Sequence, residues 1–381
     1  MPRPTVADPR SHKTASSPEM SRHRAIYEEL LKEIRSGTYQ PGDRLPSEAA
    51  LCERFDASRI TVAKAIQTLQ QDRLVMRRPG SGTYVERPEQ VASMQFGLLI
   101  PDLGTTEIFE PICQGLMRSP VAKAHSLTWG HSDPGVQNPE VVADQLCQQY
   151  IAQRVAGVFF APMEYTETSD RANRRIAATL ERAGIPVVLL DRCVERYPDR
   201  SNFDLVGIDN QRAGHLLTRH MIQAGAKRIL FAARRFSAST VEQRIAGYRE
   251  ALLAADRGAT FAVVTGDFED VAFVQKMLQS ERPDAIICAN DATAARLMQT
   301  LLGLGVRVPE EIRMSGVDDV RYARFLPVPL TTIRQDCLEM GTVAMGIMMD
   351  RLNRPDHPVR DVLVKSELIV RSSSGMPQSV E

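Results

Sequence analysis

The chain lacks any long apolar run, because no stretch approaches the roughly 20 apolar residues that a membrane-spanning helix requires. Its N-terminal part has no apolar segment of the kind found in secretory signals. Cysteine is scarce, with six residues scattered over 381 positions and no Cys-x-x-Cys pair, so neither a disulfide framework nor a zinc site is expected. We therefore expect a cytoplasmic protein with reduced thiols, and we assign it no metal, cofactor or membrane partner.

The chain has no net charge, because 47 Lys and Arg balance 47 Asp and Glu. One stretch is nevertheless basic. Residues 59–87 hold six basic side chains and two acidic ones. A basic patch on an otherwise neutral protein points to a phosphate-bearing partner. The alternative is a small helix and hairpin whose charges are merely solvated.

The basic stretch has the pattern of a helix followed by a two-stranded hairpin. Ser58 is an N-cap signal for a helix whose apolar residues recur at spacings of three and four, and so share one face. The opposite face carries Arg59, Thr61, Lys64, Gln67 and Gln71. Strands over 74–78 and 83–85 flank the turn-rich segment 79–82. Such a helix can enter a major groove while the hairpin lies along the adjacent backbone or minor groove.

Two further helices precede this one. Residues 1–20 are rich in Pro, Ser and Thr, and we interpret them as a disordered leader. The spacing of Ile26, Leu30 and Ile34 predicts an amphipathic helix that ends near Gly37. A second, short helix begins after Pro46, with Ser47 as its N-cap.

Residues 21–87 resemble the winged helix-turn-helix domain of the GntR family of bacterial transcription regulators. The matching motifs are Gly37, Pro41-Gly42-Asp43-Arg44-Leu45-Pro46-Ser47-Glu48, Ser58-Arg59-Ile60-Thr61-Val62 and Gly80-Ser81-Gly82-Thr83-Tyr84-Val85. The resemblance implies contacts with an operator in double-stranded DNA from Arg44, Ser47, Glu48, Ser58, Arg59, Thr61, Gly80 and Gly82. Lys64 and Arg78 join these candidates as basic groups on the same helix and near the hairpin tip. The family commonly has arginine where this chain has Ala63.

After residue 95, short apolar runs alternate with amphipathic helices. Expected strands include 96–100, 156–160, 186–190, 228–232, 284–288 and 312–317, and helices include 141–151, 172–183, 243–254, 271–279 and 292–302. Alternation at this spacing predicts parallel sheets covered by helices. The strands are too many for one small sheet, so we expect an α/β domain with two lobes.

Ligands of open α/β sheets bind at the carboxyl ends of strands, so the residues after each apolar run are candidates. They are Asp102, Met163, Arg192, Asp291 and Asp318, with Arg244 at a helix start and Gln335 after Ile333. Carboxylates, an amide and arginines in one cleft suit a polyhydroxylated ligand. Phe109 and Trp129 offer aromatic faces to a sugar ring. The alternative is that these side chains only cap strand ends and helix starts.

Residues 96–371 resemble the effector-binding domain of the LacI/GalR regulators, which is similar to periplasmic sugar-binding proteins. The matching motifs are Val206-Gly207-Ile208-Asp209-Asn210, Arg244-Ile245-Ala246-Gly247-Tyr248, Ala289-Asn290-Asp291-Ala292-Thr293-Ala294, Ser315-Gly316-Val317-Asp318-Asp319 and Pro329-Leu330-Thr331-Thr332-Ile333-Arg334-Gln335. The resemblance implies that Arg192, Arg244, Asp291, Asp318 and Gln335 line the cleft and that Phe109 stacks on the ligand. The segment 105–107 departs from the family's usual Asn-Pro-Phe type of motif. A GntR-type head on such a body is typical of arabinose-responsive repressors.

These patterns predict a leader (1–20), a DNA-binding domain (21–87), a linker (88–95), an effector domain (96–375) and a tail (376–381). We expect one lobe over about 96–222 and 335–352, and the other over about 226–330 and 358–375. The chain would then cross between lobes near 220–225, 330–335 and 352–358. We expect a repressor, active as a homodimer, that a small sugar releases from DNA by closing the lobes.

Two other functions remain open at this point. The effector can be a purine or nucleoside, because some LacI-type bodies bind these. Some GntR-type heads carry an aminotransferase body, which needs a Schiff-base lysine. Beyond residue 90 the only lysines are Lys123, Lys227, Lys276 and Lys365, and none has a suggestive context. The chain also has no Gly-x-Ser-x-Gly motif and no P-loop, so we do not expect an enzyme.

Overall fold

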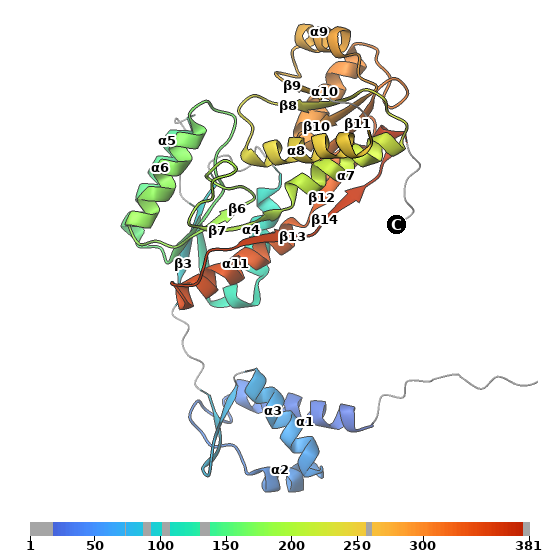
Figure 1. Cartoon of the computed structure of the whole chain (residues 1–381). Coiled ribbons are helices and arrows are strands. Elements are labelled where there is room, and N and C mark those ends of the chain that lie inside the picture. Colours follow the sequence, from blue (N-terminus) through green and yellow to red (C-terminus); the bar gives the residue numbers. More distant parts are fainter. Residues whose placement is uncertain are drawn as a thin grey trace, which may run out of the picture. The chain divides into compact units, whose positions relative to one another are not determined.

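The computed structural model describes residues 18–72, 74–86, 93–100, 107–129, 138–256 and 261–375. It divides the chain into two compact units, Met1–Ser93 and Met94–Glu381, and Figure 1 shows both. The boundary falls within the segment that we expected to be a linker. The expected tail and residues 1–17 of the expected leader lie outside the described residues, whereas residues 18–20 of that leader belong to a helix.

The first unit is a three-helix domain with a hairpin. Its elements are α1 (Pro18–Arg35), α2 (Glu48–Phe55), α3 (Arg59–Gln71), β1 (Val75–Arg78) and β2 (Gly82–Val85). The two strands pair antiparallel, with Val75 opposite Val85 and Arg78 opposite Gly82. The segment before α2 lies along the other edge of β2, because the Leu45 N–H donates to the Thr83 carbonyl at 2.9 Å. This is a winged helix-turn-helix, as the sequence predicted.

The core of this unit follows the predicted helical spacing. Buried apolar side chains come from every element around it: Ile26, Leu30, Leu45, Leu51, Val62, Ala65, Ile66, Leu69, Val75 and Val85. The apolar face of α3 packs inward and holds the helix against α1 and α2. The helix therefore presents its opposite face, which carries Arg59 and Lys64, to solvent.

The second unit contains two parallel sheets. The first sheet has the strand order β13-β7-β6-β5-β3-β4, and its described pairs are all parallel. Its strands are β3 (Gln95–Leu99), β4 (Ser126–Trp129), β5 (Gly157–Phe160), β6 (Val187–Leu190), β7 (Asp204–Ile208) and β13 (Asp361–Val364). The helices α5 (Pro139–Gln153) and α6 (Ser169–Arg182) cover one face (Figure 1). The helices α4 (Phe109–Arg118) and α11 (Cys337–Asn353) cover the other.

The second sheet has the order β14-β12-β11-β10-β8-β9, with only β14 antiparallel to its neighbour among the described pairs. Its strands are β8 (Ile229–Ala233), β9 (Ala262–Thr265), β10 (Ala285–Cys288), β11 (Arg313–Asp318), β12 (Thr331–Gln335) and β14 (Ser366–Ile369). The helices α7 (Asn210–Gln223) and α8 (Ser239–Ala254) cover one face, and α9 (Val271–Glu281) and α10 (Asp291–Gly303) cover the other. Both sheets alternate their side chains between two apolar layers, as strands buried on both faces require.

The lobes divide the chain differently from our expectation. Because α7 packs on α8 and against the second sheet, the chain already crosses at Ile208–Asn210, before the expected 220–225. The second crossing follows β12, at Gln335–Cys337. The third lies between β13 and β14, at Val364–Ser366, after the expected 352–358. An amphipathic pattern shows that a helix has a buried face, but not which sheet that face covers.

No helix in the described ranges combines the length and the apolar character needed to span a bilayer.

Candidate functional site

The start of α3 is shaped by two hydroxyl groups. The Ser58 Oγ accepts a hydrogen bond from the Thr61 N–H at 3.2 Å and lies 2.8 Å from the Thr61 hydroxyl. Thr61 is buried, so it stands with the helix cap and not on the exposed face where its spacing had placed it. Arg59 and Lys64 are exposed on that face. Two candidate DNA contacts, Arg59 and Lys64, are therefore exposed cations, and two others, Ser58 and Thr61, cap the helix.

The hairpin brings a second group of candidates together. Gly82 has a φ of +126°, and a Cβ there would lie 2.6 Å from the Arg44 Nε, so glycine lets the Arg44 side chain lie across the strand. Gly80 also has a positive φ, +73°. The Arg78 guanidinium lies 4.9 Å from the centre of the Tyr84 ring. Two exposed arginines, Arg44 and Arg78, thus lie against the hairpin.

The two candidates near α2 are bonded within the domain. Ser47 caps α2 by accepting from the Ala50 N–H at 3.2 Å. Glu48 pairs with Arg77 of β1 at 3.1 Å, which ties α2 to the hairpin. Both side chains therefore stabilise the surface on which the arginines are displayed.

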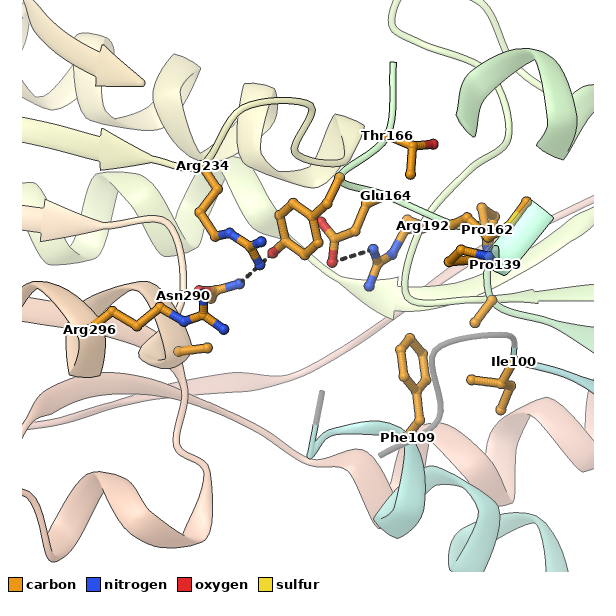
Figure 2. Close-up of a pocket in the computed structure, with 14 residues that line it drawn as sticks. Ile100, Phe109, Pro139, Pro162, Glu164, Thr166, Arg192, Arg234, Asn290 and Arg296 are labelled. Carbon is orange, nitrogen blue, oxygen red and sulfur yellow. Dashed lines mark hydrogen bonds and ion pairs between the residues drawn. The ribbon is translucent and has the colours of Figure 1, made fainter. Parts of the chain in front are cut away.

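A cavity of about 280 Å³ lies between the two lobes of the second unit. Figure 2 shows its polar side chains, which come from both lobes. Ile100, Phe109, Pro139, Glu164, Thr166 and Arg192 line it from the first lobe, with Pro162 and Met163 beside them. Arg234, Asn290, Ala292 and Arg296 line it from the second lobe. The predicted residues Phe109, Met163 and Arg192 are therefore brought together in one cavity.

Arg192 is the best-anchored side chain of this cavity. It is only 5% exposed, and it pairs with Glu164 at 2.7 Å and with Asp191 at 2.9 Å. Burial alone would lower its pKa, but the two carboxylates outweigh burial and raise the pKa further. The guanidinium carbon lies 5.6 Å from the centre of the Phe109 ring. The arginine is thus a permanent cation held beside an aromatic face.

The segment after Met163 joins the two lobes. The Tyr165 N–H donates to the Phe236 carbonyl at 2.7 Å, and the Asn290 Nδ2 donates to the Tyr165 hydroxyl at 3.0 Å. Glu164 accepts from the Ala238 N–H at 3.2 Å. Because these bonds cross from the first lobe to the second, they favour a closed arrangement of the lobes around the cavity.

Asp318 and Gln335 form a second polar group near the crossings. The Gln335 Nε2 donates to the Asp318 Oδ1 at 2.6 Å. Burial raises the pKa of Asp318 to about 7; the Asp191 and Glu164 carboxylates act in the same direction, and Arg244 acts against them. Both side chains line a larger cavity of about 1060 Å³, together with Trp129. The structure therefore places these two residues in a neighbouring opening and not in the cavity of Arg192.

Arg244 is close enough to this polar group to lower the pKa of Asp318. It is buried, its Nε donates to the Asn210 Oδ1 at 2.8 Å, and a terminal nitrogen donates to the Ala289 carbonyl at 2.6 Å. The bonds join α8, α7 and the end of β10. Arg244 therefore positions the end of β10, from which Asn290 reaches the cavity.

Asp291 does not reach either cavity. Its side chain has 0% exposure, and its two oxygens accept from the Val320 N–H at 3.1 Å and the Thr332 hydroxyl at 2.6 Å. The expected ligand contact is wrong for this arrangement, because the carboxylate points from the first turn of α10 into the second sheet. The other predicted residue, Asp102, lies outside the described residues.

Five residues that line the cavity were not among the candidates predicted from the sequence: Glu164, Tyr165, Arg234, Asn290 and Arg296. The first four follow strands β5, β8 and β10 by one to five residues, so the strand-end rule that selected Met163 and Asp291 could have found them. Arg296 lies one turn into α10 and has no such signal. Among the described residues, no three His, Cys, Asp or Glu side chains form a group able to hold a metal ion.

Comparison with known proteins agrees with this architecture. Residues 22–85 match the family described as bacterial regulatory proteins, gntR family, and residues 218–374 match the periplasmic binding protein-like domain. The chain is 28% identical over 362 residues to the arabinose metabolism transcriptional repressor of Geobacillus stearothermophilus, covering 92% of this chain and 96% of that repressor. It is 30% identical over 244 residues to the HTH-type transcriptional repressor PurR of Haemophilus influenzae (strain PittEE), covering 62% of this chain and 69% of that repressor.

Solved structures share the fold. The transcriptional regulator CelR in complex with cellobiose superposes with a TM-score of 0.62 at 22% identity, covering 83% of this chain and 90% of that chain. The regulator CcpA of Lactococcus lactis gives 0.62 at 20% identity, covering 74% of this chain and 99% of that chain. The chain belongs to the bacterial HTH-type transcriptional regulators, and it joins a gntR-family winged helix-turn-helix domain to a LacI-type effector domain of the periplasmic binding protein-like family.

Proposed function

We propose that this regulator is a repressor that a small sugar releases from its operator. The observation that carries this proposal is the cavity between the lobes, which is lined by hydrogen-bonding groups of both lobes and by the Phe109 ring. A sugar presents hydroxyls to the first and an apolar ring face to the second. The related arabinose metabolism repressor supports a sugar as the effector and repression as the sign.

The mechanism is a population shift between open and closed lobes. A ligand that contacts Arg192 in one lobe and Asn290 in the other makes both contacts only when the lobes are closed, so its binding favours closure. In a homodimer, closure would change the spacing of two winged helices and their fit to two half-sites. Because its partner is DNA, we propose that the protein acts in the cytoplasm.

A thermal-shift screen of the full chain tests the sugar class. Pentoses, hexoses, sugar phosphates and purines are tested separately. A ligand at 100 times its Kd adds about 2.7 kcal/mol to the free energy of unfolding, which gives a clear rise in melting temperature. We expect a sugar to give this rise and Arg192→Gln to abolish it. Arg175→Gln is the matched control, because Arg175 is a half-exposed arginine of the same lobe paired with Asp144.

A purine or nucleoside effector is tested by the same screen. The apolar groups Ile100, Phe109 and Pro139 on one side of the cavity also suit a flat heterocycle. A response to purines with none to sugars would replace the sugar in the proposal and leave the DNA-binding function intact.

We also propose that the second unit has no enzymatic activity. A pyridoxal phosphate enzyme needs a lysine in a closed site, whereas Lys123, Lys227, Lys276 and Lys365 are all exposed. Purified protein should show no absorbance near the visible edge. A cofactor band that borohydride reduction fixes onto one of these lysines would overturn this part.

A further inference from the structure

Three arginines line the cavity between the lobes, and they differ in how their charge is balanced. Arg192 is paired with Glu164 and Asp191. Arg296 pairs with Glu269 at 3.2 Å, at the half-exposed surface. Arg234 has no carboxylate partner among the residues that the structure describes. One guanidinium that lines the cavity is therefore without an ion-pair partner in the described part of the chain.

The Arg234 side chain is nevertheless held in place. It is partly buried, and its guanidinium carbon lies 4.0 Å from the centre of the Tyr165 ring. Stacking on an aromatic face fixes the plane of a guanidinium and leaves its edge, with its N–H donors, free to bind. Tyr165 is itself fixed by its bonds to Phe236 and Asn290. In Figure 2, Arg234 lies beside Asn290 and Arg296 at the end of the cavity away from Ile100.

A planar guanidinium with a free edge matches a carboxylate, which it can bind through two parallel hydrogen bonds. We propose that the effector is a sugar acid, a uronate or an aldonate, whose carboxylate binds Arg234 while its carbon chain or ring lies toward Phe109. This inference rests on the proposed function, because it names the chemical class of the sugar. A carboxylate contact at Arg234 would distinguish this cavity from one that binds a neutral sugar.

The charge balance favours a monoanion over a phosphate ester. A sugar phosphate carries close to two negative charges at neutral pH. Among the described residues that line this cavity, only Arg234 offers a positive charge without an ion-pair partner, because Glu269 already pairs with Arg296. The volume of about 280 Å³ also lies at the low end for a small-molecule site, which suits one sugar unit with a carboxylate.

The test compares acids with their neutral counterparts by isothermal titration of the full chain. The pairs are D-galacturonate with D-galactose, D-glucuronate with D-glucose, and L-arabinonate with L-arabinose, and D-glucose 6-phosphate represents the phosphates. We expect one acid to bind at least 10-fold more tightly than its neutral counterpart. Its affinity should fall as NaCl is raised from 50 to 500 mM, because the contact is ionic.

Two variants assign the effect to Arg234. Arg234→Gln should weaken binding of the acid at least 10-fold and change binding of the neutral sugar less than about 3-fold. Arg235→Gln is the matched control, because it removes the same charge from the next residue, which is exposed and does not line the cavity. Arg234→Lys keeps the charge without the planar fork, and it should give an intermediate loss.

Each other outcome has a defined meaning. Tighter binding of neutral sugars than of acids would overturn the sugar acid and leave the proposed function standing. Tighter binding of D-glucose 6-phosphate than of the acids would overturn the proposal that the effector carries a carboxylate. An acid that binds equally well to Arg234→Gln and to the unchanged chain would overturn the placement of its carboxylate against Arg234. In the thermal-shift screen, a response to purines alone would overturn both this inference and the sugar in the proposed function.

Discussion

Asn290 and Asp291 are adjacent in the sequence but have different surroundings. Asn290 is the N-cap of α10: its Oδ1 accepts from the Thr293 N–H at 2.9 Å, which leaves its Nδ2 free to reach Tyr165. Asp291 begins the helix, and its carboxylate turns into the sheet. A single residue therefore separates a group that lines the cavity from one that stabilises the fold.

This difference predicts that a substitution at Asp291 lowers stability, whereas one at Asn290 weakens effector binding. Asp291→Ala leaves the buried Val320 N–H and Thr332 hydroxyl without a partner, at about 1–3 kcal/mol for each group. Urea unfolding should show that loss. Asn290→Ser keeps a capping oxygen and removes only the donor to Tyr165, so it should keep most of the stability and weaken effector binding. A stable Asp291→Ala variant that has lost the effector would contradict this assignment.

Asp318 gives the effector domain a predictable dependence on pH. Its pKa is about 7 in the folded chain, against an ordinary value near 4 in the unfolded chain, because burial disfavours the charged form. Between these values the folded state binds the proton more tightly, so the free energy of unfolding falls as the pH rises. The fall is at most about 1.4 kcal/mol per pH unit, and it ends above pH 7.

The measurement is urea unfolding of the ligand-free chain at pH 5, 6, 7 and 8. Asp318→Asn should give a shallower decline from pH 5 to 7 than the unchanged chain. Asn keeps the size and shape of the Asp side chain at this position, where the backbone has a φ of +123°. The exposed Asp356 supplies the control, and Asp356→Asn should leave the slope unchanged. Equal slopes in all three proteins would refute the role of Asp318.

At the scale of elements, the first turn of α3 contains two kinds of residue. Some stabilise the helix itself, and others are exposed on its surface. Ser58 and Thr61 satisfy backbone and hydroxyl groups at its first turn, where a helix otherwise leaves four N–H groups unbonded. Arg59 follows Ser58 directly and makes none of these bonds. The helix start can therefore be weakened without removing a cation, and a cation can be removed without weakening the helix.

The two roles are separable in experiment. Ser58→Ala should lower the free energy of unfolding of the first unit by about 1 kcal/mol, the usual cost of losing an N-cap. Arg59→Gln should leave that stability unchanged and weaken DNA binding. If Arg59 contacts a phosphate, the variant should release about one counterion fewer on binding DNA. This number is read from the slope of the logarithm of affinity against the logarithm of salt concentration. A contact with a base would instead relax the sequence preference, which selection from random DNA detects.

The sequence predicted most elements of this chain, and its errors have physical causes. The helices α5, α6, α8, α9 and α10 and the strands between them appear close to where apolar spacing placed them. Periodicity records which residues are buried, but not against what, so α7 was assigned to the wrong lobe. The direction of the Asp291 side chain depends on where α10 begins, and an error of one residue at a helix start changes what a side chain faces.

At the scale of the whole effector domain, the segment of Glu164 and Tyr165 couples the cavity to the position of the lobes. Its hydrogen bonds to Phe236, Ala238 and Asn290 form only when the lobes are close. Both residues also line the cavity. A ligand that orders this segment therefore stabilises closure through contacts that the protein makes with itself.

Tyr165→Phe tests this coupling without removing the ring that faces Arg234. It deletes the bond from Asn290, whose net contribution of about 0.5–1.5 kcal/mol should weaken the apparent affinity for the effector about 2- to 13-fold. In the ligand-free variant the amide of residue 165, which donates to Phe236, should also exchange its hydrogen faster, because opening becomes less costly. Tyr197→Phe is the control, since that tyrosine of the same lobe is 83% exposed. Weaker binding with unchanged exchange would mean that Tyr165 contacts the ligand but does not hold the lobes together.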